Sequence, residues 1–518
     1  MPTDARPQSP RWAKTLLIAL CAVSCALPAA ARAQAPTPGA VQDTLGPKKP
    51  PPKAPPAQFV FPSPPPPVAH DPKDRRFTVN AFTFVGNTVY TGRQLKQLTE
   101  RYMDLQLNLH DLTRAADVVT RFYRDNGYVF AHAVVPAQRV EKGIVRIEVI
   151  EGRVGQVRFE GNRRYSPQFL RQRLTRLVSG SLITSDNLEH DLLVLNDLPG
   201  VTARAVLEAG KQFGTSDILI RVEEKIASLL LRPNNHGRRE IGRWRIDGGV
   251  SFNNPLGLLG DQLSYYAIHS QDNLLRYGRL SYSLPVGRYG TRLELGYSKS
   301  DYEIAGDLAA LGVEGDARNA DISLTHPYLR TRSQNLSFNL GLRQTKLRQR
   351  ALGVETSSTS INLLNAGLTY SQIGEDAAVT NAGAQLFTNF KGNPLGARQD
   401  AQPLKLELEA SHLRGIARNW DLYVRGQYVY SPDPLADSEK VAFGGPGSVR
   451  GYRPSEVRGD GGVLFTTELR HPINIANTLG ILSFFYDVGV ARFEGTPGFV
   501  DGTLTIQSVG SGVTFYLL

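Results

Sequence analysis

Cysteine is almost absent from the sequence: its 518 residues include only two, Cys21 and Cys25. Both lie within the first 33 residues, so a chain that starts after them has no thiol. This excludes disulfides and thiolate metal sites from the rest of the chain. It also suits a protein that crosses an oxidising compartment and folds late, because there is nothing to mispair.

Metal-ligand spacing is missing as well. The nine histidines form no His-x-x-x-His run, and no Cys/His cluster lies beyond residue 33. Glu407 and Glu409 share one face of a predicted strand and could serve as the paired carboxylates of an enzyme. Charges that line an aqueous interior explain them better. We therefore expect no enzyme, no metal and no cofactor.

Long hydrophobic runs are confined to the N-terminus. No stretch after Leu27 approaches the roughly 18 consecutive apolar residues of a membrane helix. If the mature chain crosses a membrane, it must do so with strands. The mean hydropathy of −0.25 is compatible with this, because barrel strands alternate apolar and polar residues.

The N-terminus has the pattern of a secretory signal peptide over residues 1–33. Three basic residues precede an apolar stretch, Thr15–Leu27, that is too short to span a bilayer stably. Ala31-Arg32-Ala33 is a small-x-small cleavage site, which predicts a mature start near Gln34. The alternatives are a membrane anchor or a lipoprotein attached through Cys25, with Ala22 where a larger aliphatic residue is expected.

The net charge is +11. Residues 1–33 hold four basic residues and one acid, which leaves +8 for the mature chain. The basic residues are scattered, without the basic helix or stripe that nucleic-acid binding favours. We expect no nucleic-acid partner and instead a positive lumen or periplasmic face.

Residues 34–76 form a proline-rich linker, with runs at Pro50-Pro51-Pro52 and Pro64–Pro67. Proline fixes φ and removes a backbone donor, so this segment is predicted to be extended and semi-rigid. A polyproline ligand for a partner is the alternative to a plain spacer.

Two α/β modules follow, at residues 77–152 and 153–225. The first has a strand at Phe77–Phe84, a helix at Thr91–Arg101 and a second helix at 109–126, which ends before Gly127. Two strands follow, at Val129–Val135 and Ile144–Ile150. The second has a strand at Val154–Phe159, a helix at Pro167–Leu177, a helix capped by Asp186, and strands at Val201–Leu207 and Ile218–Val222.

The modules are an internal repeat. Phe-x-Gly-Asn occurs at Phe84–Asn87 and again at Phe159–Asn162, about 75 residues later. Each module is predicted to offer a strand edge and a helix groove, where an unfolded chain can add a strand.

From Ile226 the pattern changes to strict alternation, for example at residues 244–252, 293–297, 336–342 and 404–408. Each run is about as long as a tilted membrane strand requires. A soluble sandwich is the alternative. Short turns, such as Pro285–Gly290, alternate with long ones, such as Asp301–Asn319 and Ser431–Gly462, which favours a membrane barrel over residues 226–518.

We count about 14 strands: eleven before the long 431–462 connection and three after it, at Val463–Arg470, Leu482–Val490 and Thr503–Leu517. The connection is too long for a hairpin turn and is predicted to fold inward. Its glycines do not match a nucleotide-binding loop.

The inward loop carries Val449, Arg450, Gly451 and Tyr452. Its cation has a candidate partner in Asp487, which alternation places on the inner face of its strand with Ser483, Phe485 and Gly489. A buried Arg–carboxylate pair would suit a latch, since it is costly to break and its bidentate geometry is specific.

At these residues the chain resembles the transporter component of two-partner secretion systems. This is the TpsB family, related to the haemolysin and filamentous haemagglutinin secretion proteins, in the Omp85 superfamily. The resemblance covers about residues 77–518. It is carried by Tyr128–Gln138, Val149–Gly152, Asn253–Gly257 with Gly260–Gln262, and Ser281–Gly287. Val449–Tyr452 also matches the superfamily's loop motif, and Asp487 matches its barrel-wall partner.

The resemblance implies a transmembrane antiparallel β-barrel in the outer membrane of a Gram-negative cell, preceded by two periplasmic POTRA domains. These would capture an unfolded TpsA-like exoprotein, an adhesin or a haemolysin, which then crosses the barrel without ATP. The loop at 449–452 would hold or gate the lumen. The alternative is an Omp85-type assembly factor or insertase; two modules rather than a longer array argue against it. A passive porin would not need the modules.

Two departures from the family stand out. Family members often carry an N-terminal plug helix, and residues 35–72 are too proline-rich for one. The family barrel has 16 strands, five of them after the loop, whereas this chain shows three. Either the barrel closes with fewer strands or the gene product is truncated.

Overall fold

The computed structural model describes residues 37–42, 45, 59–60, 76–257, 260–389, 404–475, 478–494 and 502–515. The predicted signal peptide and the proline runs at 50–52 and 64–67 lie outside these ranges. From Thr37 onward the chain forms one compact unit. In the described ranges no helix combines the length and apolarity needed to cross a membrane.

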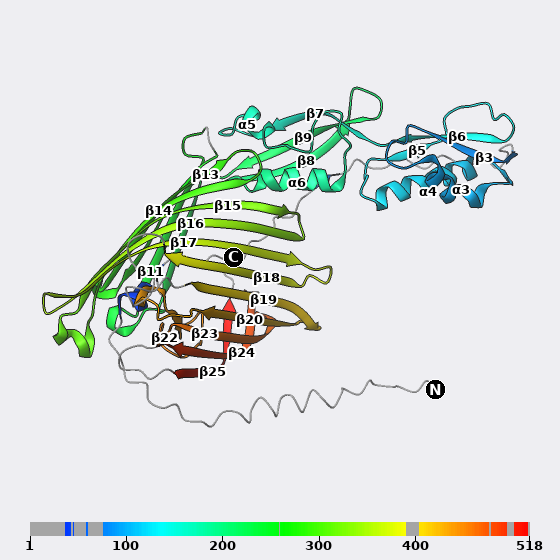
Figure 1. Cartoon of the computed structure of the whole chain (residues 1–518). Helices are drawn as coiled ribbons and strands as arrows, with labels where there is room; N and C mark the ends of the chain where they lie inside the picture. The colour runs from blue at the N-terminus through cyan, green and yellow to red at the C-terminus, as the bar shows by residue number, and fades with distance from the viewer. Residues whose placement is uncertain are drawn as a thin grey trace, which may run out of the picture. The chain divides into compact units, whose positions relative to one another are not determined.

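The first module is a three-stranded sheet with helices on one face (Figure 1). The sheet order is β3-β6-β5, with β3 parallel and β5 antiparallel to β6. Phe82, Leu95, Val119, Tyr123 and Ile147 are fully buried between the layers. The elements are β2 (Phe77–Val79), β3 (Ala81–Val85), α3 (Gly92–Thr99), η1 (Glu100–Tyr102), β4 (Leu105–Leu107), α4 (Leu109–Asp125), β5 (His132–Val134) and β6 (Ile144–Ile150).

Local sequence explains where these helices begin and end. Thr91 and Asn108 are N-caps that form capping boxes with Gln94 and Asp111. Gly127 follows α4 with φ +88°, as expected for C′. The single strand predicted at Phe77–Phe84 is wrong. It breaks at Asn80, whose backbone N–H donates to Gly143 O at 2.7 Å, and its first part pairs with β4 instead.

The second module repeats this plan with β7 (Arg153–Glu160), α5 (Pro167–Arg171), α6 (Ser185–Asn196), β8 (Val201–Ala209) and β9 (Thr215–Glu224). The helix predicted at Pro167–Leu177 ends early, because the carboxylate of Asp191 accepts the backbone N–H groups of Arg176 and Leu177 at 2.9 and 2.8 Å. The N-cap of α6 is Thr184, and Asp186 lies in the first turn.

The internal repeat is reproduced in atomic detail. A Cβ at Gly86 would lie 2.4 Å from Val149 O, and one at Gly161 would lie 2.5 Å from Val222 O. Both glycines also have positive φ, so larger residues are excluded at both turns. The amides of Asn87 and Asn162 each donate at 2.8 Å to the carbonyl three residues later.

A glutamate closes each turn of the repeat: Glu151 is buried and Glu224 is partly buried. Glu151 accepts the backbone N–H of Val89 at 2.8 Å and the hydroxyl of Tyr123 at 3.0 Å, and it also bonds Thr88. Burial by itself raises the pKa of Glu151, but these hydrogen bonds outweigh it and lower the pKa. Glu224 accepts the backbone N–H groups of residues 163–165 in the same way.

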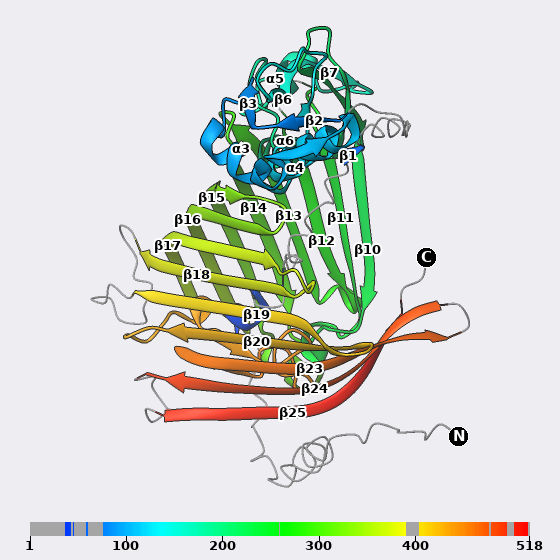
Figure 2. The ribbon, with the colours of Figure 1, turned by 90° about the vertical axis from the view of Figure 1, so that its right-hand side faces the viewer.

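In the part of the chain that the structure describes, fourteen antiparallel strands form one sheet in sequence order (Figure 2). Eleven precede the long connection and three follow it, as counted from the sequence. In the described ranges β10 and β25 each pair along one edge only. The strands are β10 (Ala227–Asn234), β11 (Arg245–Asn253), β12 (Gln262–Ser270), β13 (Leu275–Val286), β14 (Thr291–Glu303), β15 (Glu314–Arg330), β16 (Gln334–Ala351), β17 (Val354–Ile373), β18 (Val379–Asn389), β19 (Lys405–Ala417), β20 (Trp420–Tyr430), β23 (Gly461–Ile475), β24 (Thr478–Phe493) and β25 (Gly502–Phe515).

The two faces of this sheet differ as the alternation predicts. Phe338, Leu340 and Leu342 of β16 are about 40% exposed on the outer, apolar face. The inner face carries ion pairs such as Arg279–Asp321, with N–O distances of 2.6 and 2.9 Å. An apolar exterior and a charged interior are the arrangement of a transmembrane barrel.

One predicted turn is wrong. The connection expected at Asp301–Asn319 is mostly strand, because β14 and β15 remain paired as far as Glu303 and Glu314. Only residues 304–313 connect them, and they include η4 (Gly306–Leu311). Charged residues in both strands misled the prediction, since a strand that runs past the membrane can be polar on both faces.

Candidate functional site

The inward loop between β20 and β23 is an ordered element. It contains η5 (Asp437–Glu439) and an antiparallel pair, β21 (Val441–Phe443) and β22 (Val457–Gly459). Apolar residues of the loop and of the sheet form one buried cluster. The loop contributes Val441, Phe443, Val449 and Val457, and the sheet contributes Val429, Leu464, Ala491 and Ile506. The loop is thus held by a small hydrophobic core that it shares with the sheet.

Glycine in β24 lets the loop come close to the sheet. A Cβ at Gly489 would lie 3.0 Å from both the Phe443 ring and the Val449 side chain. Val449 is fully buried at this contact. Because any larger residue at 489 would push the loop away, this inner-face glycine determines how closely the loop motif approaches the sheet.

Arg450 and Asp487 form an ion pair where the loop contacts the sheet. The Arg450 guanidinium donates from Nε and Nη2 to the two Asp487 oxygens, at 2.7 and 2.8 Å. The backbone N–H of Arg450 donates to the same carboxylate at 3.1 Å. Asp487 has no exposed surface. Such a bidentate, buried contact fixes the geometry of both partners.

Sequence reasoning missed three further contacts of this cluster. Nη1 of Arg450 donates to Glu468 on β23 at 2.6 Å, and Arg470 donates to the same carboxylate at 2.9 Å. The Arg450 guanidinium also lies 3.5 Å from the centre of the Phe485 ring. β23 is the strand that directly follows the loop, and its alternation places Glu468 on the inner face. The sequence pattern could therefore have predicted Glu468 as a second partner of Arg450.

The rest of the motif shapes the backbone around Arg450. Gly451 has φ +89°, a conformation that residues with a side chain rarely adopt. Tyr452 packs partly buried against the apolar cluster of the loop. The four predicted residues therefore occupy one site, with Val449 and Tyr452 in apolar contact and Arg450 in the charged contact.

A second charged contact, which was not predicted, holds the first limb of the loop. Arg343 on β16 donates to both oxygens of Glu439, at 2.8 and 2.9 Å. Nζ of Lys405 on β19 donates to Glu439 Oε2 at 3.2 Å. Glu439 and Lys405 are 4% and 5% exposed, so this pair is buried like the first. We call it the Glu439 anchor, and the Arg450–Asp487–Glu468 contact the Arg450 anchor.

A short helix near the N-terminus contacts the same loop. The segment expected to be too proline-rich for a plug helix contains the five-residue helix α2 (Pro38–Gln42), with Pro38 at its first position, where no backbone donor is needed. Ala40 and Val41 are buried. Ser455 donates to Ala40 O at 3.3 Å, and Arg458 donates to the Thr37 hydroxyl at 3.1 Å.

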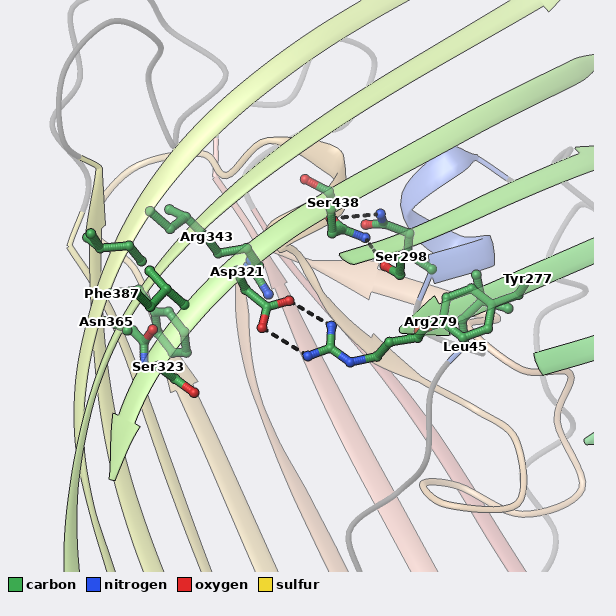
Figure 3. A pocket seen from close by; sticks show the side chains of 16 residues that line it. Leu45, Tyr277, Arg279, Ser298, Asp321, Ser323, Arg343, Asn365, Phe387 and Ser438 are labelled. Carbon is green, nitrogen blue, oxygen red and sulfur yellow. Dashed lines mark hydrogen bonds and ion pairs between the residues drawn. The ribbon is translucent and has the colours of Figure 1, made fainter. Parts of the chain in front are cut away.

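A polar cavity of about 430 Å³ lies between these parts and the strand wall (Figure 3). Strands β13 to β18, the N-terminal segment and η5 all contribute to its lining. The Arg279–Asp321 pair crosses it, and Ser298, Asn365 and Ser438 point polar groups toward it. Such a surface offers hydrogen bonds to an extended polypeptide without a pocket shaped for one small ligand.

The carboxylates considered for catalysis have other partners. Glu407 pairs with Lys405 at 3.0 Å, and Glu409 pairs with Arg425 at 2.8 Å. The described ranges contain no group of three or more His, Cys, Asp or Glu side chains placed to bind a metal. Both glutamates act as charges of the polar inner face.

The second module is fastened to the sheet by polar contacts. Arg330 at the end of β15 donates to both oxygens of Asp197, at 2.8 and 2.6 Å. Arg164 donates to the carbonyls of Asn254 and Pro255 at 2.8 and 2.7 Å. The predicted motif Asn253–Gly257 is therefore the turn on which this module rests.

Two family models match the chain. Residues 214–514 match the haemolysin secretion/activation protein ShlB/FhaC/HecB family, and residues 77–152 match the POTRA domain, ShlB-type. The heme/hemopexin transporter protein HuxB of Haemophilus influenzae is 28% identical over 442 residues, which cover 82% of this chain and 78% of HuxB. The outer membrane transporter CdiB of Escherichia coli is 26% identical over 419 residues, covering 76% and 68%.

Solved structures show the same fold. CdiB from Escherichia coli has a TM-score of 0.67 at 22% identity, over 87% of this chain and 86% of that one. BamA from Haemophilus ducreyi, lacking POTRA domains 1-3, has a TM-score of 0.54 at 17% identity, over 85% and 94%. Both support a β-barrel preceded by POTRA domains.

Proposed function

The chain belongs to the haemolysin secretion/activation protein ShlB/FhaC/HecB family, the TpsB-type outer-membrane transporters of two-partner secretion, and from this we propose that it exports one unfolded partner exoprotein. The partner is a TpsA-like protein of the adhesin or haemolysin type. It is recognised in the periplasm and passes through the barrel without ATP. The single observation that carries the proposal is an ordered loop anchored to the charged inner face of a strand wall whose outer face is apolar, in a chain with two POTRA modules.

We assign residues 77–152 to POTRA 1, residues 153–225 to POTRA 2 and residues 226–518 to the barrel. In this assignment the two POTRA modules recognise the partner. POTRA 1 ends its sheet in the antiparallel strand β5, and the POTRA 2 sheet ends in β8, along which only the two-residue strand β1 (Phe59–Val60) is added. An extended chain can bind such an edge through its backbone, with little demand on its sequence. This suits a partner that arrives unfolded.

The inner face supplies the path. Its ion pairs and amides offer hydrogen bonds to the backbone of a passing chain, so the chain does not have to shed water without compensation. The loop and α2 now lie against this path, and both must shift for a polypeptide to pass. Export therefore includes a step in which the loop and the N-terminal segment move.

The Arg450 anchor defines the resting position of the loop. Removing one partner of a buried ion pair costs about 3–5 kcal/mol, because the other charge remains buried. Asp487 would be left in that state without Arg450, since its side chain has no exposed surface. The anchor thus favours one loop position strongly and gives the lumen a defined resting state.

Deletion of the gene tests the function. We expect one large exoprotein to accumulate in the periplasm and to disappear from the surface or medium, while other outer-membrane proteins keep their normal levels. Complementation with the full chain should restore export. A broad loss of outer-membrane proteins would contradict the proposal and favour an assembly factor of the same superfamily.

A further inference from the structure

The outer face of β14, β15 and β16 changes from apolar to charged toward one end of these strands. On β16 the outer face carries Leu336, Phe338, Leu340 and Leu342, and then Gln344, Lys346, Arg348 and Arg350, all four of them exposed. The same change occurs on β15 after Ile322 and on β14 after Leu295, which are paired through the strand register. The boundary between the apolar and the charged part therefore lies at one level on all three strands.

The charged ends of the three strands point toward the cell surface. At the opposite end, Arg330 of β15 binds Asp197, and the backbone N–H of Arg332 donates to Glu189, both in POTRA 2. Because the POTRA modules lie in the periplasm, the other end lies on the external side. Lys346 follows Leu336 by ten residues, which is about the length of a strand that crosses the membrane. Lys346 is thus placed at the level of the external lipid headgroups.

Three cations stand side by side at this level. Lys299 of β14 lies opposite Arg318 of β15, which in turn lies opposite Lys346 of β16. The side chains of Lys299 and Arg318 are 47% and 49% exposed, and Lys346 is exposed too. Like charges directly opposite one another in neighbouring strands destabilise a sheet. An anion that contacts all three would remove this repulsion. We call Lys299, Arg318 and Lys346 the basic row.

The inner face keeps the three strands together beneath the basic row. The Asn319 amide donates to the Ser298 hydroxyl at 3.2 Å, and the Thr345 hydroxyl donates to the Asn319 carbonyl oxygen at 2.7 Å. Ser298 and Thr345 are buried. With neighbouring strands about 4.8 Å apart, the first and third cations start from backbones about 10 Å apart. The strands cannot spread to relieve the repulsion, so the basic row is preorganised.

Charges beyond the basic row are mixed. Asp301 pairs with Lys299 at 3.0 Å, and Asp316 pairs with Arg318 at 3.6 Å, from one position further out on the same strands. Arg348 lies opposite Asp316 in that second row. On β14 to β16 the two rows hold four basic residues and two acids, a net charge of +2. The level next to the apolar band is the purely positive one, and this is where a membrane holds the anionic groups of its lipids.

The external ends of β18, β19 and β20 differ from this arrangement. Their outer face carries Leu386, Leu406, Tyr428 and Tyr430, with the two tyrosine rings stacked on each other. Tyr428 and Tyr430 are exposed toward lipid. Aromatic residues of this kind form the ordinary girdle of a membrane barrel. The basic row therefore gives β14 to β16 a different headgroup contact from that of β18 to β20.

We propose that the basic row is a binding site for the phosphate groups of the glycolipid that forms the outer leaflet of the outer membrane. The occupant is a phosphorylated lipid because the row continues directly into the apolar band, where acyl chains lie. The Arg318 guanidinium can bind one phosphate through two N–H groups, and the two lysines act as point charges on either side. Bound lipid cancels the repulsion within the row. The site thus stabilises this part of the barrel wall and is independent of the export function.

Titration of the full chain in detergent with fluorescent bisphosphorylated lipid A tests the site. We expect Lys299→Gln/Arg318→Gln/Lys346→Gln to bind the lipid roughly tenfold more weakly than the wild type, because three cations beside the headgroup are lost. The variant Lys299→Arg/Arg318→Lys/Lys346→Arg keeps the charge and should stay within about twofold of the wild type. Lys346→Gln alone leaves both ion pairs of the row in place and should weaken binding about threefold.

The matched control is Lys96→Gln/Arg114→Gln/Lys211→Gln, which removes the same two lysines and one arginine in number from exposed positions of the POTRA modules. It should bind the lipid like the wild type. Wild-type affinity in the triple variant of the basic row, or an equal loss of affinity in this control, would overturn the proposal.

The unfolding temperature in detergent gives a second readout and distinguishes the lipid from free phosphate. Bisphosphorylated lipid A should raise the unfolding temperature of the wild type and leave that of the neutralised triple variant nearly unchanged, because only the wild type has a repulsion to relieve. Lipid A without its phosphates should affect both proteins alike. Inorganic phosphate at the same phosphate concentration should affect neither. A rise with inorganic phosphate as large as with the lipid would reveal a simple anion site and overturn the lipid assignment.

Discussion

The two anchors of the inward loop have opposite charge patterns. At the Arg450 anchor the loop supplies the cation, and adjacent strands β23 and β24 supply the acids. At the Glu439 anchor the loop supplies the acid, and strands β16 and β19 supply the cations. The two limbs of the loop are thus tied to different parts of the wall by ion pairs that cannot exchange partners without placing like charges together.

The anchors also differ in which charged partners remain when one residue is removed. Among the residues that the structure describes, the fully buried Asp487 forms no ion pair other than the one with Arg450. Without Glu439, Lys405 still has Glu407 at 3.0 Å, and the Arg343 side chain is 38% exposed to water. We infer that the Arg450 anchor is the harder to replace, and that the Glu439 anchor adjusts the position of the loop.

Removal of Arg450 should have the largest effect. We expect Arg450→Ala to reduce export at least roughly tenfold with normal amounts of protein in the membrane, because a buried carboxylate loses its partner. Export would be measured as surface or secreted partner. Arg450→Lys should rescue little, since an ammonium lacks the fork that binds both Asp487 oxygens.

Arg453→Ala is the matched control for this prediction. Arg453 lies in the same loop, but its side chain is 45% exposed and pairs with Glu240 at 3.0 Å. Exposed pairs contribute little, so export should stay near the wild-type level. Normal export by Arg450→Ala would remove this anchor from the mechanism.

Neutralising Glu439 should have an intermediate effect. We expect Glu439→Gln to lower export about threefold to fivefold, because Lys405 keeps its pair with Glu407 and the Arg343 side chain is 38% exposed to water. The double variant Glu439→Gln/Lys405→Met should recover most of that loss, as a coupled pair does in a double-mutant cycle. Glu355→Gln, an exposed position on β17, is the control. Additive losses in the double variant would contradict a direct contact.

Release of the N-terminal segment should have the smallest effect on export. Arg458→Ala removes the contact to Thr37, which holds the N-terminal segment beside the loop, and a contact to Asp437 within the loop. We expect export to stay within about twofold, because the Asp437 side chain is 40% exposed and water can solvate it when Arg458 is removed. Passage of a large hydrophilic antibiotic through the outer membrane should rise. Unchanged permeability would show that α2 does not obstruct the lumen.

The Arg450 anchor was predictable because alternation fixes which side chains of one strand point inward. Residues 483–489 sufficed to place Asp487 opposite the loop. The same rule applied to β23 would have found Glu468. The strand count was predictable too, since each membrane strand repeats the period of two.

The Glu439 anchor was not predictable from the sequence. It joins η5 to β16 and β19, and their positions around the sheet follow from register and curvature that no local pattern encodes. The pairing of Phe59–Val60 with β8 was not predictable for the same reason. Two residues show no periodicity, and the prolines around them favour an extended chain but do not indicate which strand it pairs with. The early end of α5 depended on Asp191, a residue of the next helix.

The central claim is that a polypeptide crosses the interior of this barrel, and a photo-crosslinking residue placed on either face of β17 tests it most directly. Asn365 lines the inner cavity, and Leu368 lies half exposed on the outer face. With the partner arrested during export, we expect crosslinks to it from position 365 and none from position 368. Crosslinks from both positions, or from neither while export proceeds, would contradict passage through the lumen.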